Sequence, residues 1–160
     1  MLLSCSEKEA FVKTMLLGLV MAGLFGCSAL AGEEWLTDFN KAKKEAVEKN
    51  LPILADFSGS DWCGWCIKLD KEVFSQKEFK AFAKDRVVLF LADFPRAKEL
   101  AAEVKAQNEQ LMQTYGVQGF PTVLLLDAGG KVIARTGYRR GGATAYVDYL
   151  KELLTKSGDK

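Results

Sequence analysis

Apolar and polar positions along the chain follow spacings that predict helices and strands in alternation. Between residues 33 and 50, apolar side chains recur every three or four positions, the spacing that places them on one face of a helix. They are Trp35, Phe39, Ala42 and Ala46. Residues 51–57 form a short apolar run with Pro52 near its start, which is typical of a buried strand. Residues 87–93 are almost continuously apolar, so we expect a strand covered on both faces.

The alternation continues along the rest of the chain and then changes. Helices are predicted from about residue 63 to 71, over 76–84 and over about 97–115. Strands are predicted at 122–127 and 131–135, and the glycines between them supply the positive φ that a hairpin turn needs. A last helix has an apolar inner face made of Ala143, Tyr146, Val147, Leu150 and Leu154.

This order of elements predicts the α/β class. Helices and strands alternate first and a hairpin comes last, which implies a central mixed sheet of about four strands flanked by helices. The chain has 160 residues, of which 49% are hydrophobic, enough for one domain with a real core. We expect this domain to cover residues 32–160 and to be a monomer.

The first thirty-one residues are predicted to be a secretory signal peptide. Lys13 precedes an apolar run at 15–25, which is too short to span a bilayer but has the length of a signal core. Small residues follow and end in Ala29-Leu30-Ala31, the small-x-small pattern that signal peptidase accepts. We therefore expect an exported, periplasmic protein whose mature chain starts near Gly32.

A second cleavage site is possible within the same segment. Leu24-Phe25-Gly26-Cys27 is similar to the lipobox of bacterial lipoproteins, in which the cysteine is lipidated and becomes the new N-terminus. In that case the leader is residues 1–26, and Cys27 anchors the protein to the cell envelope. The sequence leaves soluble export and lipid anchoring both open, and it predicts membrane attachment only if Cys27 is lipidated.

The charge balance argues against a nucleic-acid partner. The chain has 22 basic and 21 acidic side chains, a net charge of +1. Nucleic-acid binding needs a clustered basic excess, and none is visible in the sequence.

The cysteines indicate redox chemistry. Cys5 and Cys27 lie in the predicted leader, so Cys63 and Cys66 are the pair expected in a soluble mature form. Haem attachment is excluded because it needs a histidine after the second cysteine, and the chain has no histidine. A structural zinc site needs four ligands, and the pair Cys63 and Cys66 supplies two. A purely structural disulfide across so short a loop would constrain the unfolded chain little. We expect no metal and no cofactor, and redox chemistry is the favoured alternative.

The predicted position of the pair supports this interpretation. It lies just after a strand and at the start of a helix, where free backbone N–H groups and the positive helix end stabilise a thiolate. Cys63 is expected to be the exposed attacking sulfur. Cys66, one turn further, is expected to resolve the mixed disulfide.

The sequence resembles the thioredoxin superfamily over about residues 33–156, essentially the whole predicted mature chain. The matching motifs are Asp56-Phe57, Trp62-Cys63-Gly64-Trp65-Cys66 and Gly116-Val117-Gln118-Gly119-Phe120-Pro121-Thr122. The resemblance is greatest to exported bacterial thioredoxin-like proteins with a Gly-Ser-Asp-Trp-Cys loop. It implies a thioredoxin-like fold with an extra N-terminal helix, and thiol–disulfide oxidoreductase activity through Cys63 and Cys66.

The resemblance also implies roles for two residues outside the cysteine pair. Pro121 would be a cis-proline facing the pair, where the backbone of Phe120 can hydrogen-bond an extended substrate. Asp56 would be a buried acid that assists proton transfer at Cys66. The alternative for Asp56 is a strand-end aspartate bonded to backbone.

Three departures from the usual thioredoxin pattern bear on these roles. One extra residue lies between Asp56 and Cys63, the dipeptide inside the motif is Gly64-Trp65 instead of Gly-Pro, and the strand at 87–93 has no lysine to partner the buried acid. Each departure can change the reduction potential of the pair.

The aromatic residues beside the pair predict a surface for binding client proteins. Trp62 and Trp65 offer flat apolar area at low side-chain entropy cost, unless one of them packs inward. Together with Gly64, Phe120 and Pro121, they are the residues expected to contact substrate. Tyr138, Arg139 and Arg140 could border the same surface or form an ordinary polar loop.

The sequence favours a protein-disulfide reductase or exchange protein but leaves the direction of electron flow open. The expected partners are cysteine-containing client proteins of the envelope and a membrane thiol reductase that donates electrons. A disulfide isomerase or oxidase is one alternative. A thioredoxin-fold module that binds clients without turnover is another.

Overall fold

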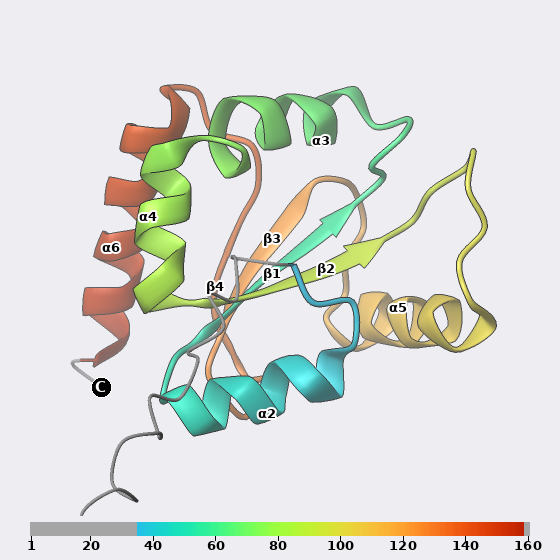
Figure 1. The fold of residues 1–160 in the computed structure, drawn as a ribbon, viewed down its shortest axis with the longest axis horizontal. Coiled ribbons are helices and arrows are strands. Elements are labelled where there is room, and N and C mark those ends of the chain that lie inside the picture. Colours follow the sequence, from blue (N-terminus) through green and yellow to red (C-terminus); the bar gives the residue numbers. More distant parts are fainter. Residues whose placement is uncertain (1–34, 159–160) are drawn as a thin grey trace, which may run out of the picture. The chain divides into compact units, whose positions relative to one another are not determined.

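The structure, a computed structural model, describes residues 35–158, with side chains to residue 156 (Figure 1). The predicted leader, the cleavage site near Gly32 and Cys27 lie outside the described residues, so export and lipidation remain predictions. Within the described part of the chain, none of the helices combines the length and apolar character needed to cross a bilayer.

Four strands form one mixed sheet in the order β2-β1-β3-β4. The strands are β1 (Ile53–Ser58), β2 (Val88–Asp93), β3 (Thr122–Leu126) and β4 (Val132–Thr136). β1 pairs in parallel with β2 and antiparallel with β3, and β3 forms an antiparallel hairpin with β4. All six residues of β1 are buried, as expected for an inner strand. The predicted mixed four-stranded sheet is confirmed.

Helices cover both faces of this sheet (Figure 1). They are α2 (Phe39–Lys49), α3 (Gly64–Leu69), α4 (Lys77–Arg86), α5 (Ala102–Thr114) and α6 (Gly142–Gly158), with a π-helical turn η1 (Asp70–Phe74) directly after α3. The core divides accordingly. Ile53, Ala55 and Phe57 of β1 pack in a cluster with α2 and α5, whereas Leu54 packs in a cluster with α3, η1, α4 and α6. Because side chains alternate along a strand, Asp56 points to the second face, where the cysteine pair lies.

The first helix is shorter than its apolar spacing predicts. It begins at Phe39, where the Asp38 carboxylate caps it by accepting hydrogen bonds from the backbone N–H of Asn40 and Lys41. Leu36 instead forms a parallel bridge with Phe90 beside β2. Trp35 packs against Phe74 and Phe79, on the opposite face of the sheet from α2. The prediction that Trp35 shares a helix face with Phe39 is therefore wrong, because the chain here pairs with the sheet.

Helix α5 also starts later than predicted. α5 begins at Ala102, and residues 94–101 form a loop instead of the first turn of the helix. The predicted inner face of the last helix is confirmed, since Ala143, Tyr146, Val147 and Leu150 are buried and Leu154 packs against the same cluster. Gly130 has φ +92° in the β3–β4 turn, the positive value that the hairpin was expected to need.

Candidate redox site

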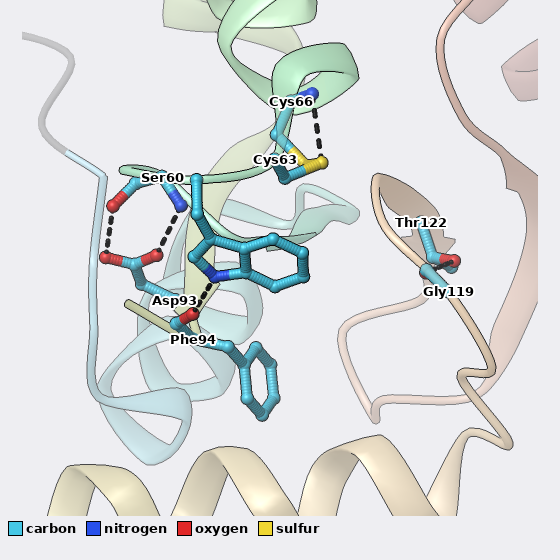
Figure 2. The surroundings of a disulfide bond; sticks show 8 residues. Ser60, Cys63, Cys66, Asp93, Phe94, Gly119 and Thr122 are labelled. Atoms are coloured by element: carbon cyan, nitrogen blue, oxygen red, sulfur yellow. Dashed lines mark hydrogen bonds between the residues drawn. A yellow bond between two sulfur atoms is a disulfide. The ribbon is translucent and has the colours of Figure 1, made fainter. Parts of the chain in front are cut away.

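Cys63 and Cys66 form a disulfide at the N-terminal end of α3, with their Cα atoms 5.2 Å apart (Figure 2). Cys63 has extended backbone angles and is the N-cap of the helix. Its Sγ accepts a hydrogen bond from the backbone N–H of Cys66 at 3.2 Å. A sulfur thus takes the position of the usual N-cap oxygen, and it meets the free N–H groups and positive dipole end of the first turn. Such an environment stabilises a thiolate.

The expectation that Cys63 is exposed is wrong for this disulfide form. Cys63 is 7% exposed and Cys66 is 4% exposed, so both are buried. The disulfide and the hydrogen bond from Cys66 hold the Cys63 sulfur over the first turn of α3.

The loop before β3 contains the cis-proline that the resemblance implied. The peptide bond between Phe120 and Pro121 is cis. The Thr122 hydroxyl donates to the Gly119 carbonyl at 2.7 Å and fixes the turn (Figure 2). Phe120 meets the ring of Trp62 edge-on, with centroids 5.9 Å apart, so the proline loop contacts the segment that carries the cysteines.

Trp62 is held in place by contacts on several sides yet remains partly exposed. Its indole N–H donates to the Phe94 carbonyl at 2.7 Å (Figure 2), and the Arg96 guanidinium lies 3.8 Å from the centre of its ring. The residue is 37% exposed. The Trp62 side chain is therefore neither fully buried nor fully exposed.

Trp65 is the more exposed of the two tryptophans, at 54%. Its ring contacts Tyr138 at a centroid distance of 5.1 Å, and the Lys68 ammonium lies 5.3 Å from the centres of both rings. The Tyr138 hydroxyl in turn donates to Glu72. Tyr138 therefore borders the same surface as Trp65, one of the two outcomes that the sequence left open.

The three residues before Cys63 fasten this loop to the segment after β2. The backbone N–H and the hydroxyl of Ser60 donate to the Asp93 carboxylate at 3.0 and 2.8 Å (Figure 2). The Asp61 carboxylate accepts from the backbone N–H groups of Arg96, at 3.0 and 3.1 Å, and Ala97, at 2.6 Å. The hydrogen bonds from these two N–H groups, Arg96 first and Ala97 second, lower the pKa of Asp61.

We call the bonds of Ser60, Asp61 and Trp62 to residues 93–97 the loop clamp. Sequence reasoning did not identify it, because its two halves lie more than thirty residues apart. The one available signal was the extra residue between Asp56 and Cys63, which lengthens the loop that carries the clamp.

Asp56 is buried on β1, at 5% exposure, and its Oδ1 has no hydrogen-bond partner among the described residues. Burial, reinforced by the charges of Asp70 and then Asp93 and opposed by a hydrogen bond from Ser58, raises its pKa to about 8. Its sheet neighbours are Leu91 on β2 and Val123 on β3, so neither adjacent strand supplies a cation at this position.

Asp56 and Cys66 line the same pocket, which has a volume of about 210 Å³. The structure thus brings the predicted acid to the predicted resolving cysteine in spite of the extra loop residue. An acid with a pKa near that of a thiol can exchange a proton with it at small free-energy cost. Within residues 35–158, no group of three or more His, Cys, Asp or Glu side chains is arranged to hold a metal ion.

Comparison with known proteins agrees with this geometry. A profile of the thioredoxin-like domain matches residues 39–152. The chain is 36% identical over 126 residues to the disulfide bond reductase DsbH of Chlamydia pneumoniae, covering 79% of this chain and 75% of DsbH. It is 29% identical over 136 residues to the thioredoxin-related protein DsbJ of the same organism, covering 83% of this chain and 39% of DsbJ.

A solved structure of a DsbH oxidoreductase matches the fold with a TM-score of 0.73 at 36% sequence identity, over 76% of this chain and 84% of that one. The relative DsbH is a disulfide bond reductase, and this chain has the Cys63–Cys66 disulfide at the start of α3. The chain therefore belongs to the thioredoxin-like family.

Proposed function

We propose that the protein is an exported protein-disulfide reductase, which reduces or exchanges disulfides of envelope proteins through Cys63 and Cys66. The observation that carries the proposal is the disulfide at the start of α3. Cys63 is the N-cap of this helix, and Cys66 lines a pocket together with the buried Asp56. The coarser function, thiol–disulfide exchange, follows from the family. The reducing direction is supported by the similarity to a disulfide bond reductase.

The first step uses the reduced form of the pair. The Cys63 thiolate, stabilised by the N-terminus of α3, attacks one sulfur of a client disulfide. A bond forms between Cys63 Sγ and that sulfur while the client S–S bond breaks. The second client sulfur leaves as a thiolate and takes a proton from water.

The second step resolves the mixed disulfide. The ionised Asp56 carboxylate accepts the proton of the Cys66 thiol, and the resulting thiolate attacks Cys63 Sγ. The Cys63–Cys66 disulfide forms and the remaining client sulfur leaves as a thiolate, so two electrons have passed to the client. Asp56 ends the step protonated, which agrees with a pKa of about 8 in the disulfide form.

Clients would bind across the surface beside the pair. Trp62, Gly64, Trp65, Phe120 and Pro121 are the proposed contact residues, with the backbone of Phe120 pairing an extended client segment. The partial exposure of Trp62 and Trp65 supports this role, because aromatic side chains bury apolar area against many different chains. Electrons would come from a membrane thiol reductase, since an exported reductase needs a donor.

The experiment that tests the reducing direction is a measurement of the reduction potential of the Cys63–Cys66 pair. The full chain is equilibrated with graded thiol buffers, free thiols are trapped, and the peptide containing both cysteines is quantified by mass, so that Cys5 and Cys27 do not contribute. We expect a potential near that of thioredoxin, about −270 mV.

A potential of about −180 mV or higher would replace the reductase with an isomerase or oxidase. A pair that does not titrate, together with a Cys63 that resists alkylation, would favour a client-binding module without turnover.

A further inference from the structure

A second carboxylate lies on the pocket that joins Asp56 to Cys66. Asp70 is the first residue of η1, and its backbone N–H donates to the Cys66 carbonyl one turn earlier. Residues four apart on a helix lie on the same face, so Asp70 follows Cys66 along the face that lines the pocket. The helix changes from α to π geometry at this residue, a change that often occurs at functional sites.

The pocket connects buried groups to solvent. Its buried lining residues are Asp56, Ser58, Cys66 and Phe74, whereas Ser60, Ile67 and Asp70 are exposed. Asp56 and Asp70 therefore line the same space, Asp56 at its buried side and Asp70 at its exposed side. The negative charge of one carboxylate disfavours ionisation of a buried carboxyl group nearby.

Two carboxylates, Asp70 and Asp93, act on Asp56, and the negative charge of Asp70 is offset less by neighbouring groups. Asp93 is bound by the Lys98 ammonium at 2.9 Å and by two groups of Ser60, which offset its charge. Asp70 accepts a hydrogen bond from the Ser75 hydroxyl at 3.1 Å and forms no ion pair within the described residues.

Within the described residues, Tyr146 of α6 is a further titratable group that interacts with Asp56. It is buried, its hydroxyl donates to the Gly137 carbonyl at 3.2 Å, and burial raises the pKa of this phenol. Tyr146 is therefore neutral at the pH values of interest. After burial, the charge of Asp70 contributes most to raising the pKa of Asp56, and the charge of Asp93 contributes less.

We propose that Asp70 is a positioning residue that keeps a proton on Asp56 while the Cys63–Cys66 disulfide is formed. The inference rests on the role of Asp56 in the proposed function. The proton on Asp56 makes the disulfide form ready to be reduced, because the Cys66 sulfur needs a proton when the S–S bond breaks.

The step that uses this proton is the attack of a donor dithiol on the disulfide. A donor thiolate bonds to Cys63 Sγ, the S–S bond breaks, and its electron pair goes to Cys66 Sγ, which takes the proton from Asp56. The second donor thiolate then attacks the donor sulfur of the mixed disulfide and releases Cys63 as a thiolate. The donor is oxidised to a disulfide, and the pair has gained two electrons and one proton.

The test is the pH dependence of this reduction in the full chain. Dithiothreitol reduces the disulfide in a stopped-flow instrument at a series of pH values from 6 to 9.5. The fluorescence of the flanking Trp62 and Trp65 reports the reduction. Each measured rate is divided by the fraction of dithiothreitol that is present as thiolate at that pH. In the wild type, the normalised rate is expected to fall above a break near pH 8, where Asp56 loses its proton.

Asp70→Asn removes the charge but keeps an oxygen that can accept the bond from Ser75. We expect it to move the break about 0.5 to 1 pH unit lower, the size of one partly screened charge. Asp70→Glu should retain the wild-type break. Asp85→Asn, which removes an exposed aspartate from α4, is the matched control and should also leave the break unchanged.

Two further variants decide how Asp70 acts. Asp56→Asn should abolish the break, and adding Asp70→Asn to it should then change nothing, because the charge would have no acid to act on. A shift that persists in the double variant would overturn the inference, since Asp70 would then act on Cys66 itself. A break that is not shifted in Asp70→Asn would also overturn the inference.

If Asp56→Asn itself keeps the wild-type break, the proposed role of Asp56 fails and this inference fails with it. The direction of electron flow is decided separately by the reduction potential. Failure of the inference and failure of the reductase proposal are therefore distinguishable.

Discussion

Trp62 and Trp65 flank the same disulfide, but the structure holds them in different ways. Trp62 donates to a backbone carbonyl and lies so close to Gly59 that a Cβ added there would come within 2.5 Å of its ring. Trp65 contacts Tyr138 and Lys68 at the surface and makes no comparable backbone bond in the described chain. The first residue therefore belongs to the architecture of the site as well as to its surface, whereas the second is mainly a contact surface.

Alanine substitutions should separate these roles. We expect Trp62→Ala to lower the free energy of unfolding by about 2 kcal/mol, because it removes a hydrogen bond and partly buried ring contacts. Trp65→Ala should cost less than about 1 kcal/mol, the scale of a surface aromatic pair. Urea unfolding of the disulfide form measures both values.

The same two variants should differ in catalysis. Trp65→Ala is expected to raise the KM for a protein disulfide while leaving the rate with a small disulfide nearly unchanged. Equal losses of stability in the two variants, or an unchanged KM in Trp65→Ala, would contradict the assignment.

At the residue scale, most of the site could be predicted because its motifs are local. The spacing of Cys63 and Cys66, and their place between a strand and a helix, already indicate redox chemistry. Asp56 and Pro121 followed from the resemblance, and the structure places Asp56 on the pocket of Cys66 and Pro121 after a cis bond. Asp70 was not predicted, because its relation to Asp56 depends on the pocket that residues of η1 and β1 line together.

At the scale of elements, helix positions were predictable and two helix starts were not. Trp35 falls in phase with Phe39 by coincidence, since residue 36 pairs beside β2 and ends the helical spacing. Asp38 does indicate where α2 begins, because an aspartate before an apolar helical run is a typical N-cap. Residues 94–101 gave no such signal, because their path depends on Ser60 and Asp61 far away in the sequence.

The loop clamp gives a testable account of that segment. Asp61→Ala removes the acceptor of the Arg96 and Ala97 amides. These two amides are therefore expected to exchange with deuterium about ten times faster, which corresponds to the loss of about 1.4 kcal/mol of local stability. Hydrogen exchange followed by NMR on the disulfide form measures this.

Asp61→Asn is the matched control for the clamp, because its amide oxygen can still accept both bonds. We expect it to retain most of the protection of the Arg96 and Ala97 amides. Amides of β1 should be unaffected in either variant. Protection that survives in Asp61→Ala would show that the segment after β2 holds its conformation without the clamp.

At the scale of the whole molecule, the site places an ionisable group on the inner strand of the sheet. β1 is buried along its whole length, and Asp56 is its one ionisable residue, without a cation on either neighbouring strand. A buried carboxyl without an ion-pair partner destabilises the fold when it is charged. The protein therefore keeps a group that suits proton transfer at the expense of stability.

This conflict predicts how stability depends on pH. The pKa of Asp56 is about 8 in the folded disulfide form and near 3.8 when the chain is unfolded. Between these values the unfolded state binds fewer protons than the folded state, so the contribution of Asp56 to stability is complete below about pH 4. It is lost as the pH rises toward 8, by up to about 1.4 kcal/mol per pH unit.

Asp56→Asn isolates this contribution, because it removes the titration and leaves every other ionisable group in place. We expect the stability of Asp56→Asn minus that of the wild type to increase by at least about 2 kcal/mol between pH 5 and pH 8, as measured by urea unfolding of the disulfide forms. Asp85→Asn should show no such increase, because Asp85 is exposed on α4. A difference that does not change with pH would mean that Asp56 is already ionised in the folded protein at neutral pH. In that case it could not carry the proton that the Cys66 sulfur takes up when the disulfide is reduced.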